Sequence, residues 1–120
     1  MKKELELKLV ENYPNLFKDY NGDPRETAMS WGFECCDGWY DLIDELSKKL
    51  EPLGVVAMQV KEKFGGLRFY IGAVDNEIAD EVFQYISEAE EKSYEICELC
   101  GKPGKVNREG WIQVRCTECK

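Results

Sequence analysis

Residues 55–73 read VVAMQVKEKFGGLRFYIGA, and this stretch decides the fold. Apolar side chains alternate with other residues on both sides of Gly65-Gly66, and they are Val56, Met58 and Val60 before the glycines and Leu67, Phe69 and Ile71 after them. A period of two is typical of a strand with one buried face. A Gly-Gly pair between two such runs suits a tight turn, because glycine readily adopts the positive φ values of these turns. We therefore expect an antiparallel hairpin here.

Amphipathic helices are predicted on both sides of this hairpin. Before it, Asp37 is a suitable N-cap, and a helix is expected from there to residue 50, because Pro52 and Gly54 then stop it. After it, residues 76–95 form the second clear helical pattern. The apolar stripes at helical spacing are Trp39, Leu42, Ile43, Leu46 and Leu50 in the first helix, and Ile78, Val82, Ile86 and Ala89, with Phe83 beside them, in the second.

The N-terminal part of the chain is less regular. Residues 3–12 are rich in Glu, Lys and Leu, and this composition favours a helix, although Leu5, Leu7 and Leu9 would also fit a strand. Residues 25–36 are interpreted as an irregular segment that carries aromatic side chains. The predicted fold class is α+β, with two or three helices packed on a small antiparallel β-hairpin or sheet and a cysteine-rich module at the C-terminus.

This module contains two CxxC pairs with 15 residues between them, formed by Cys97, Cys100, Cys116 and Cys119. Two residues between paired ligands let a turn direct both thiolates at one ion, and this spacing is typical of structural zinc sites such as zinc ribbons. The residues between the pairs predict turns and one short strand. Because four thiolates leave no open position for water, we predict one structural Zn²⁺ rather than a catalytic ion.

Disulfides or a redox pair are the alternatives for these cysteines. The first ten residues have no unbroken apolar core, so we expect no signal peptide, and a reducing cytoplasm disfavours disulfides. No thioredoxin-like βαβ pattern surrounds either pair. Cys35 and Cys36 are adjacent, which strains a mutual bridge, and at least one is expected to be buried as an apolar side chain. We divide the chain into an α+β body, residues 1–95, and a zinc module, residues 96–120, packed on it as one compact unit.

Composition and charge exclude several function classes. The chain has no histidine, which excludes histidine-based nucleophilic catalysis and histidine metal ligands. No apolar run approaches the roughly 20 residues of a membrane span. The net charge of −8 disfavours nucleic acids as partners. Residues 96–120 nevertheless carry +2, whereas residues 75–98 hold nine acidic side chains and one basic one, which form either a solvated helix face or a surface for a basic partner.

Three motifs resemble those of a family of small uncharacterised proteins of bacteriophages and bacterial mobile elements. Residues 33–43, FECCDGWYDLI, resemble its FECGDGW motif, and residues 60–70, VKEKFGGLRFY, resemble its central motif. Residues 96–104, ICELCGKPG, with Gly110-Trp111 before the second cysteine pair, resemble its C-terminal tail. Cys36 stands where the family has glycine, and Cys119 where histidine is common. The resemblance implies a phage or prophage setting and a bacterial cytoplasm, and it implies no assigned activity.

The central motif also predicts a ligand site. Its candidate residues are Lys61, Lys63, Gly65, Gly66, Arg68 and Tyr70. The cations and the glycine N–H groups could hold a phosphate, and the tyrosine could stack on a base. The alternative is a hairpin with a solvated polar face. A P-loop is excluded, because the GxxxxGK[ST] pattern is absent.

Carboxylates near residue 40 allow a different interpretation. Asp37, Asp41 and Asp44 share one helical edge, where they could hold Mg²⁺ or act as acid and base. Acidic residues in the first turns also stabilise a helix through its dipole, which explains them without chemistry. Trp39 either fills the core or anchors a partner.

Three function classes follow. The one that we favour is a non-enzymatic zinc protein that docks on a host or phage protein, for example to inhibit a bacterial defence system, with contacts at Trp39, Glu81, Glu88 and Glu91. The second is a nucleotide or cyclic-nucleotide sponge that uses the hairpin 61–70. The third, which the missing catalytic constellation disfavours, is a metal-dependent enzyme that uses the aspartates. We expect a protein partner and neither a nucleic acid nor a membrane, and the oligomeric state is left open.

Overall fold

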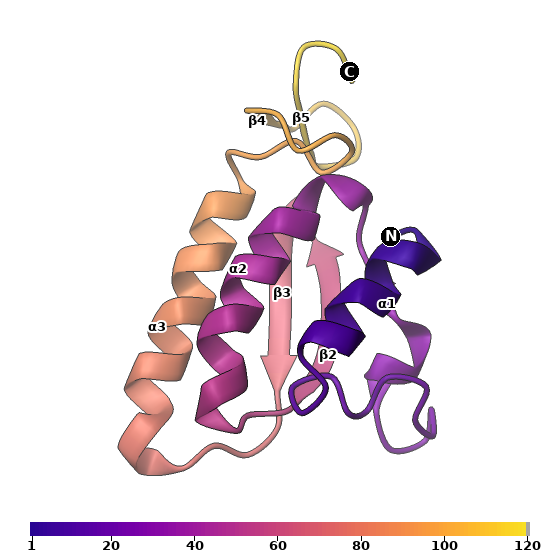
Figure 1. Cartoon of the computed structure of the whole chain (residues 1–120). Helices are drawn as coiled ribbons and strands as arrows, with labels where there is room; N and C mark the ends of the chain where they lie inside the picture. The colour runs from indigo at the N-terminus through magenta and orange to yellow at the C-terminus, as the bar shows by residue number, and fades with distance from the viewer. Residues whose placement is uncertain (120) are drawn as a thin grey trace.

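The computed structural model describes residues 1–119, so Lys120, the last residue of the predicted zinc module, lies outside it. The helices are α1 (Lys3–Asn12), α2 (Tyr40–Leu50) and α3 (Asn76–Ser93), and the strands are β1 (Phe33–Glu34), β2 (Ala57–Lys63), β3 (Gly66–Ile71), β4 (Lys105–Asn107) and β5 (Gln113–Arg115). Short 3₁₀ helices span Ala28–Trp31, Asp37–Trp39 and Glu51–Leu53. The α+β class predicted from the sequence is confirmed, and residues 3–12 form a helix rather than a strand (Figure 1).

The sheet of the body contains the predicted hairpin and one further strand. β2 and β3 pair antiparallel, with Val60 opposite Phe69 and Lys61 opposite Arg68. β1 pairs with the other edge of β2 in the parallel direction, with Phe33 opposite Val60. The sheet is therefore mixed: the expected antiparallel hairpin is present, and the segment 25–36, expected to be irregular, adds a two-residue parallel strand to it. A strand of two residues is too short to show alternation, and its pairing comes from a long-range contact.

The start of the second predicted helix also differs from the expectation. The chain makes a 3₁₀ turn over Asp37–Trp39 before α2 begins at Tyr40, and no side chain caps either start. The carboxylate of Asp37 instead accepts a hydrogen bond from the backbone N–H of Lys2, 2.7 Å away. Asp37 therefore binds a free N–H group at the start of α1, and the prediction that it caps its own helix was wrong.

Helices cover one side of the sheet. Figure 1 shows α2 in front of the strands, with α1 on one side of it and α3 on the other. The side chains between these layers form one core, and the largest of those that are fully buried are Trp39, Phe17, Leu9, Leu16, Met29, Ile43, Leu50, Leu67, Val60 and Val82. Burying an aliphatic or aromatic side chain of this size stabilises the fold by about 1.5–3 kcal/mol.

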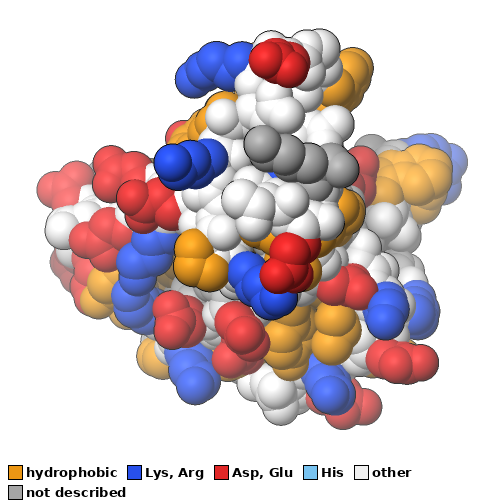
Figure 2. All heavy atoms as spheres, turned by 90° about the horizontal axis from the view of Figure 1, so that it is seen from above, with side chains coloured by type: hydrophobic (Ala, Val, Ile, Leu, Met, Phe, Trp, Pro, Cys, Tyr) orange, Lys and Arg blue, Asp and Glu red, His pale blue; other side chains and the backbone are white. Residues whose placement is uncertain are grey.

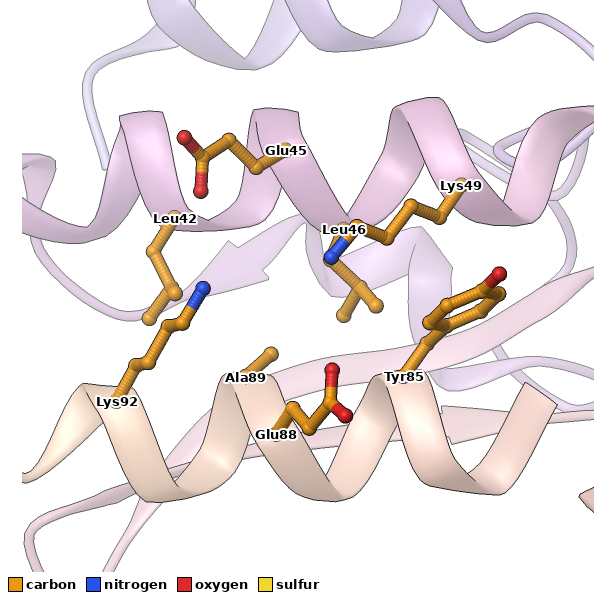
Figure 3. Close-up of a pocket in the computed structure, with 8 residues that line it drawn as sticks. All are labelled: Leu42, Glu45, Leu46, Lys49, Tyr85, Glu88, Ala89 and Lys92. Carbon is orange, nitrogen blue, oxygen red and sulfur yellow. The ribbon is translucent and has the colours of Figure 1, made fainter. Parts of the chain in front are cut away.

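The contact between α2 and α3 is drawn in Figure 3, where Leu42 and Leu46 of α2 face Ala89 of α3. Ala89 is buried, and its small side chain lets the two helices approach closely. Beside these residues, the ammonium group of Lys49 lies 5.3 Å from the centre of the Tyr85 ring. The α2–α3 contact is therefore apolar at its centre and closed by a cation–π pair at its margin.

Buried polar groups attach the irregular segments to the helices. The carboxylate of Glu6 on α1 accepts hydrogen bonds from the Phe33 N–H and from the Tyr20 hydroxyl, at 3.1 and 2.8 Å. At the opposite edge of the sheet, the Ser93 hydroxyl at the end of α3 accepts a hydrogen bond from the Leu67 N–H of β3 at 2.9 Å. These bonds fix both margins of the sheet, because an unpaired buried N–H costs about 1–3 kcal/mol. Among the described residues, no helix is both long and apolar enough to cross a membrane.

Candidate metal centre

The four predicted ligand cysteines come from two turns at the end of the molecule. Cys97 follows α3 by four positions, and a turn closed by the Gly101 N–H to the Cys97 carbonyl, at 2.9 Å, brings Cys100 back toward it. Gly101 has a φ of +84°, which glycine adopts without strain. The hairpin of β4 and β5 then returns the chain, and Cys116 follows β5 directly. The second turn, closed by the Cys119 N–H to the Cys116 carbonyl, adds the fourth thiol.

The geometry of the thiols suits a single ion. All four Sγ atoms lie within 4.8 Å of one another, and those of Cys100 and Cys116 are 3.5 Å apart. Tetrahedral coordination with Zn–S bonds of about 2.3 Å requires sulfur atoms about 3.8 Å apart. Within residues 1–119, this is the one group of three or more potential ligands that is close enough to share a metal. The four cysteines therefore form a single metal site of the kind that zinc occupies.

Backbone groups around the site favour the thiolate form of Cys97. Burial alone raises the pKa of this thiol, but its sulfur accepts hydrogen bonds from the N–H groups of Cys100, Cys116 and Leu99, which lower the pKa to about 6. The pKa of Cys119 is raised to about 12, chiefly by its hydrogen bonds to the neighbouring thiols of Cys116 and Cys100. The four sulfurs thus share protons when no ion is bound, and a divalent cation would replace those protons.

The first cysteine turn is packed directly on the body. The carbonyl of Glu98 accepts the Gly38 N–H at 2.7 Å, and the Trp39 indole N–H donates to the Ile96 carbonyl at 3.1 Å. A Cβ atom on Gly38 would collide with the backbone of Cys97 and Glu98, so glycine is needed for this close approach. The Glu98 carboxylate, which is 6% exposed, accepts the Cys36 N–H and forms an ion pair with Arg115. The metal site is therefore held at the N-terminal end of α2.

Trp39 was also a candidate partner contact, and the structure excludes that role. Its side chain is 0% exposed, and its indole nitrogen is hydrogen-bonded inside the molecule. A side chain with no accessible surface cannot contact a partner, so the expectation of a partner contact at Trp39 was wrong. The core position, which was the alternative, is the observed one. The exposed tryptophans are Trp31 and Trp111, at 69% and 77%.

The acidic candidates on α3 fall into two groups. Glu81 and Glu91 are exposed, and Glu81 accepts a hydrogen bond from the Tyr85 hydroxyl at 2.9 Å. Glu88 is half-buried, and its carboxylate points toward α2 in Figure 3. It accepts a hydrogen bond from the Gln84 amide at 3.2 Å. Glu81 and Glu91 are therefore exposed to a partner, whereas Glu88 is only partly exposed.

The predicted ligand residues of the hairpin do not act as one set. Arg68 forms an ion pair with Glu90 of α3 at 3.4 Å. Gly65 and Gly66 are buried, and the Gly65 N–H donates to the Glu62 carboxylate at 2.7 Å, so it is not free for a phosphate. Tyr70 is 43% exposed and points to solvent on the strand face opposite the core.

Lys61 and Lys63 lie beside residues 110–112 of the zinc module, a neighbour that the sequence did not predict. Residues 61–64 and residues 110–112 together line a hollow of about 430 Å³. Its two exposed aromatic side chains are Phe64 and Trp111, of which Phe64 is 66% exposed. Sequence analysis missed this pair, because 47 positions separate the two residues and neither belongs to a periodic pattern. Their position beside glycines in two turns was the only local sign that they could be exposed.

The aspartates near residue 40 do not converge. The Asp37 carboxylate binds the backbone of Lys2, and that of Asp44 accepts the Tyr13 hydroxyl at 2.7 Å. No group that includes them meets the geometry of a shared metal in the part of the chain that the structure describes.

The two adjacent cysteines of the body lie outside the metal cluster. Cys35 is buried, and burial raises the pKa of its thiol. Cys36 is half-buried, with its pKa raised by burial and by the Glu98 carboxylate.

Comparisons with known proteins do not identify a family for this chain. No protein-family model, curated protein or solved structure matches it. Of the three motifs in the phage-family resemblance, the structure supports the C-terminal one, whose cysteines cluster as a zinc ribbon requires. The function must therefore be argued from the residues of the chain itself.

Proposed function

We propose that the chain is a non-enzymatic binding protein that holds one structural zinc ion and docks on a protein partner. The observation that supports this most directly is the closed set of four thiols at 97, 100, 116 and 119. Four thiolate ligands complete the tetrahedral shell of Zn²⁺, so the ion has no position for a substrate or a reactive water. The role left to the metal is to hold the β4–β5 hairpin and the first cysteine turn against the body.

The exposed side of α3 is the surface that we propose for the partner. Figure 2 shows acidic side chains gathered on the side of the molecule that α3 occupies in Figure 1, at the left in both views. Glu81 and Glu91 belong to this acidic surface, and the exposed side of α3 also carries Phe83, which is 51% exposed. An acidic surface with an aromatic anchor fits a basic protein surface that carries an apolar pocket.

The biological setting that we propose follows from the phage-family resemblance. In a bacterial cytoplasm, a small acidic binding protein of a phage or prophage would act by occupying a host or phage protein. Inhibition of a bacterial defence system is the concrete form that we favour. Such an inhibitor needs a rigid surface and no catalytic group, which agrees with the closed metal site.

A second candidate function is the binding of a nucleotide or cyclic nucleotide by the hairpin 61–70. One observation favours it: Lys61 and Lys63 line a hollow that also contains two exposed aromatic rings. Arg68, with its partner on α3, does not belong to that hollow. This candidate therefore concerns the tip of the hairpin rather than its open face.

The metal is tested by native mass spectrometry of gently purified, reduced protein. We expect the mass of one zinc ion per chain, and its absence from freshly prepared protein would contradict the proposal. The same spectrum reports the oligomeric state and any retained small molecule.

Docking is tested by affinity capture from bacterial cells with two double variants. Glu81→Lys with Glu91→Lys reverses the charge of the α3 surface, and Glu4→Lys with Glu11→Lys makes the same charge change at exposed positions of α1. We expect a partner, identified by mass spectrometry, that binds the wild type and the α1 variant but not the α3 variant. Equal capture by both variants would show that α3 is not the docking surface.

A further inference from the structure

The hollow between the hairpin tip and the zinc module is built by contacts that fix both of its sides. On one side, residues 61–64 end β2 and begin the turn to β3. On the other side, residues 110–112 lead into β5, whose end carries the second pair of thiols. A Cβ atom on Gly65 would lie 3.0 Å from the Ile112 side chain, so the turn and this loop are in direct contact. This contact brings Phe64 and Trp111, the chain neighbours of Gly65 and Ile112, to the same part of the surface.

The two aromatic rings of the hollow, those of Phe64 and Trp111, differ in whether a cation already occupies one of their faces. The ammonium group of Lys63 lies 5.6 Å from the centre of the Phe64 ring, so one face of that ring already faces a cation. No cation–π partner is found for Trp111 among residues 1–119, and this side chain is 77% exposed. Trp111 is therefore the ring on which a planar ligand would stack, with Phe64 lining the same hollow.

The charge of the hollow is opposite to that of the molecule. The chain has a net charge of −8. The hairpin residues that line the hollow, 61–64, include two lysines and one glutamate. The one acidic residue there, Glu62, accepts the Gly65 N–H and so helps to form the turn. Within the described part of the chain, neither Lys61 nor Lys63 forms an ion pair. An anion would find two ammonium groups that have no carboxylate partner among residues 1–119, of which that of Lys63 also faces the Phe64 ring.

We propose that this hollow binds a nucleotide unit, with the base stacked on Trp111 and the phosphate held by Lys61 and Lys63. The proposal builds on the second candidate function and moves its site from the sheet face to the junction with the zinc module. It is independent of docking through α3. Figure 2, which looks onto this end of the molecule, shows hydrophobic side chains at the surface next to Lys and Arg side chains.

The same chemistry is present in a free nucleotide and in a single-stranded oligonucleotide. A second hollow, of about 460 Å³, is lined by residues 107–109, Lys105 and Arg115. Residues 107–109 directly precede residues 110–112 of the first hollow in the sequence. Arg108 is exposed in this second hollow. Arg108 lines the second hollow and not the first, so we expect a contact with it from a strand that extends into the second hollow and none from a mononucleotide held in the first. The effect of substituting Arg108 therefore distinguishes the two sources.

The test is fluorescence anisotropy on the zinc-loaded full chain, with a labelled single-stranded oligothymidylate of about ten nucleotides as the probe. Thymidine monophosphate and hexaglutamate serve as competitors. The variants are Trp111→Ala and the pair Lys61→Glu with Lys63→Glu. Trp31→Ala is the matched control, because Trp31 is also largely exposed, at 69% against 77%, but does not line the hollow. Zinc content and circular dichroism verify that each variant is folded.

We expect the wild type to bind, and binding to weaken at least about fivefold in Trp111→Ala, because base–aromatic stacking contributes that much per base. The double lysine variant should lose binding and the salt dependence that phosphate contacts cause. Competition by the mononucleotide with no effect of Arg108→Glu identifies a free nucleotide as the ligand. Weak competition with a loss in Arg108→Glu identifies a single strand.

Three outcomes would overturn the proposal. The first is the absence of binding by both ligands at millimolar concentration. The second is unchanged affinity in Trp111→Ala, which would show that no base stacks there. The third is equal competition by hexaglutamate, which would show that the hollow recognises negative charge alone, as in an acidic peptide. None of these results bears on capture through α3, so the two proposals can fail separately.

Discussion

The carboxylate of Glu98 accepts a hydrogen bond from the backbone N–H of Cys36, 3.0 Å away and 62 positions earlier in the chain. Its other oxygen lies 3.6 Å from the guanidinium of Arg115, at the end of β5. Glu98 stands between the first two thiols of the metal site, and both its side chain and its carbonyl face the body. One buried residue therefore connects the first cysteine turn, the β4–β5 hairpin and the start of the second helix.

Glu98→Ala tests this connection. The substitution removes the acceptor of the Cys36 N–H and leaves Arg115, 15% exposed, without its partner. We expect the free energy of unfolding to fall by about 2–4 kcal/mol, since a broken buried pair leaves an uncompensated charge. Glu98→Gln keeps an acceptor oxygen and should lose less. Urea unfolding in excess zinc measures both variants.

The control for Glu98 is Glu118→Ala. Its partner, Lys102, is 58% exposed, and Glu118 itself is 69% exposed. Water already screens this pair, so we expect no measurable change in the free energy of unfolding. If the two variants were equally stable, the buried carboxylate would not connect the module to the body.

Removal of the metal should act first on the C-terminal module. We expect a strong chelator to abolish the dispersed amide NMR signals of β4 and β5 before those of α2, because the module buries few side chains of its own. Cys97→Ser should lower zinc affinity by more than about 100-fold, since even substitutions outside the ligand shell cost about 10–100-fold. Cys36→Ser is the matched control: its thiol is not in the cluster, and it should retain one zinc ion.

Gly38→Ala should strongly destabilise the protein. The added Cβ atom would meet the carbonyl oxygens of Cys97 and Glu98, and this contact is with backbone, which cannot rotate away. We expect a loss of at least about 2 kcal/mol in thermal or urea unfolding, at the upper end for an overpacked site.

Gly72→Ala serves as the comparison for Gly38. Its Cβ atom would meet the Met58 sulfur at 3.6 Å, which is an ordinary contact. Because alanine restricts the unfolded chain more than glycine does, this variant should be neutral or slightly more stable. Similar effects of the two substitutions would argue against a tight fit at Gly38.

The stability of the protein should decline at alkaline pH, in part through Cys35. Burial raises the pKa of this thiol in the folded state, and the Glu98 carboxylate adds to the rise. In the unfolded chain the thiol ionises near pH 8.5, so its contribution is fully present below that pH and is lost as the pH rises toward the folded pKa. Above pH 8.5, the free energy of unfolding should fall more steeply than in Cys35→Ala, by at most about 1.4 kcal/mol per pH unit.

Chemical denaturation between neutral and alkaline pH measures this difference. The tyrosines and the metal site are common to both proteins, so their titration cancels in the comparison. Parallel curves for the wild type and Cys35→Ala would show that the thiol ionises equally well in the folded and unfolded states.

Local patterns predicted a large part of the fold. The alternation around Gly65-Gly66 predicted β2 and β3, and the apolar stripe after residue 75 predicted α3, which ends at Ser93 instead of residue 95. The strand β1 was missed, because its two residues carry no period and only the edge of β2 makes them a strand. The same limit applies to Asp37, whose carboxylate binds an N–H group that lies 35 positions away in the sequence.

The chain by itself determined the chemistry of the metal site, because the distance between ligands within each CxxC pair is set by one turn of backbone. It also determined which segments are amphipathic. Only the tertiary structure decided which tryptophan is buried and which is exposed: Trp39 lies in the core, and Trp111 faces solvent beside Phe64. It likewise joined Arg68 to Glu90 and left the two lysines of β2 free of ion pairs within residues 1–119. The exposure of a side chain and its ion-pair partners depend on what packs against it from distant parts of the chain. The local sequence pattern does not contain this information.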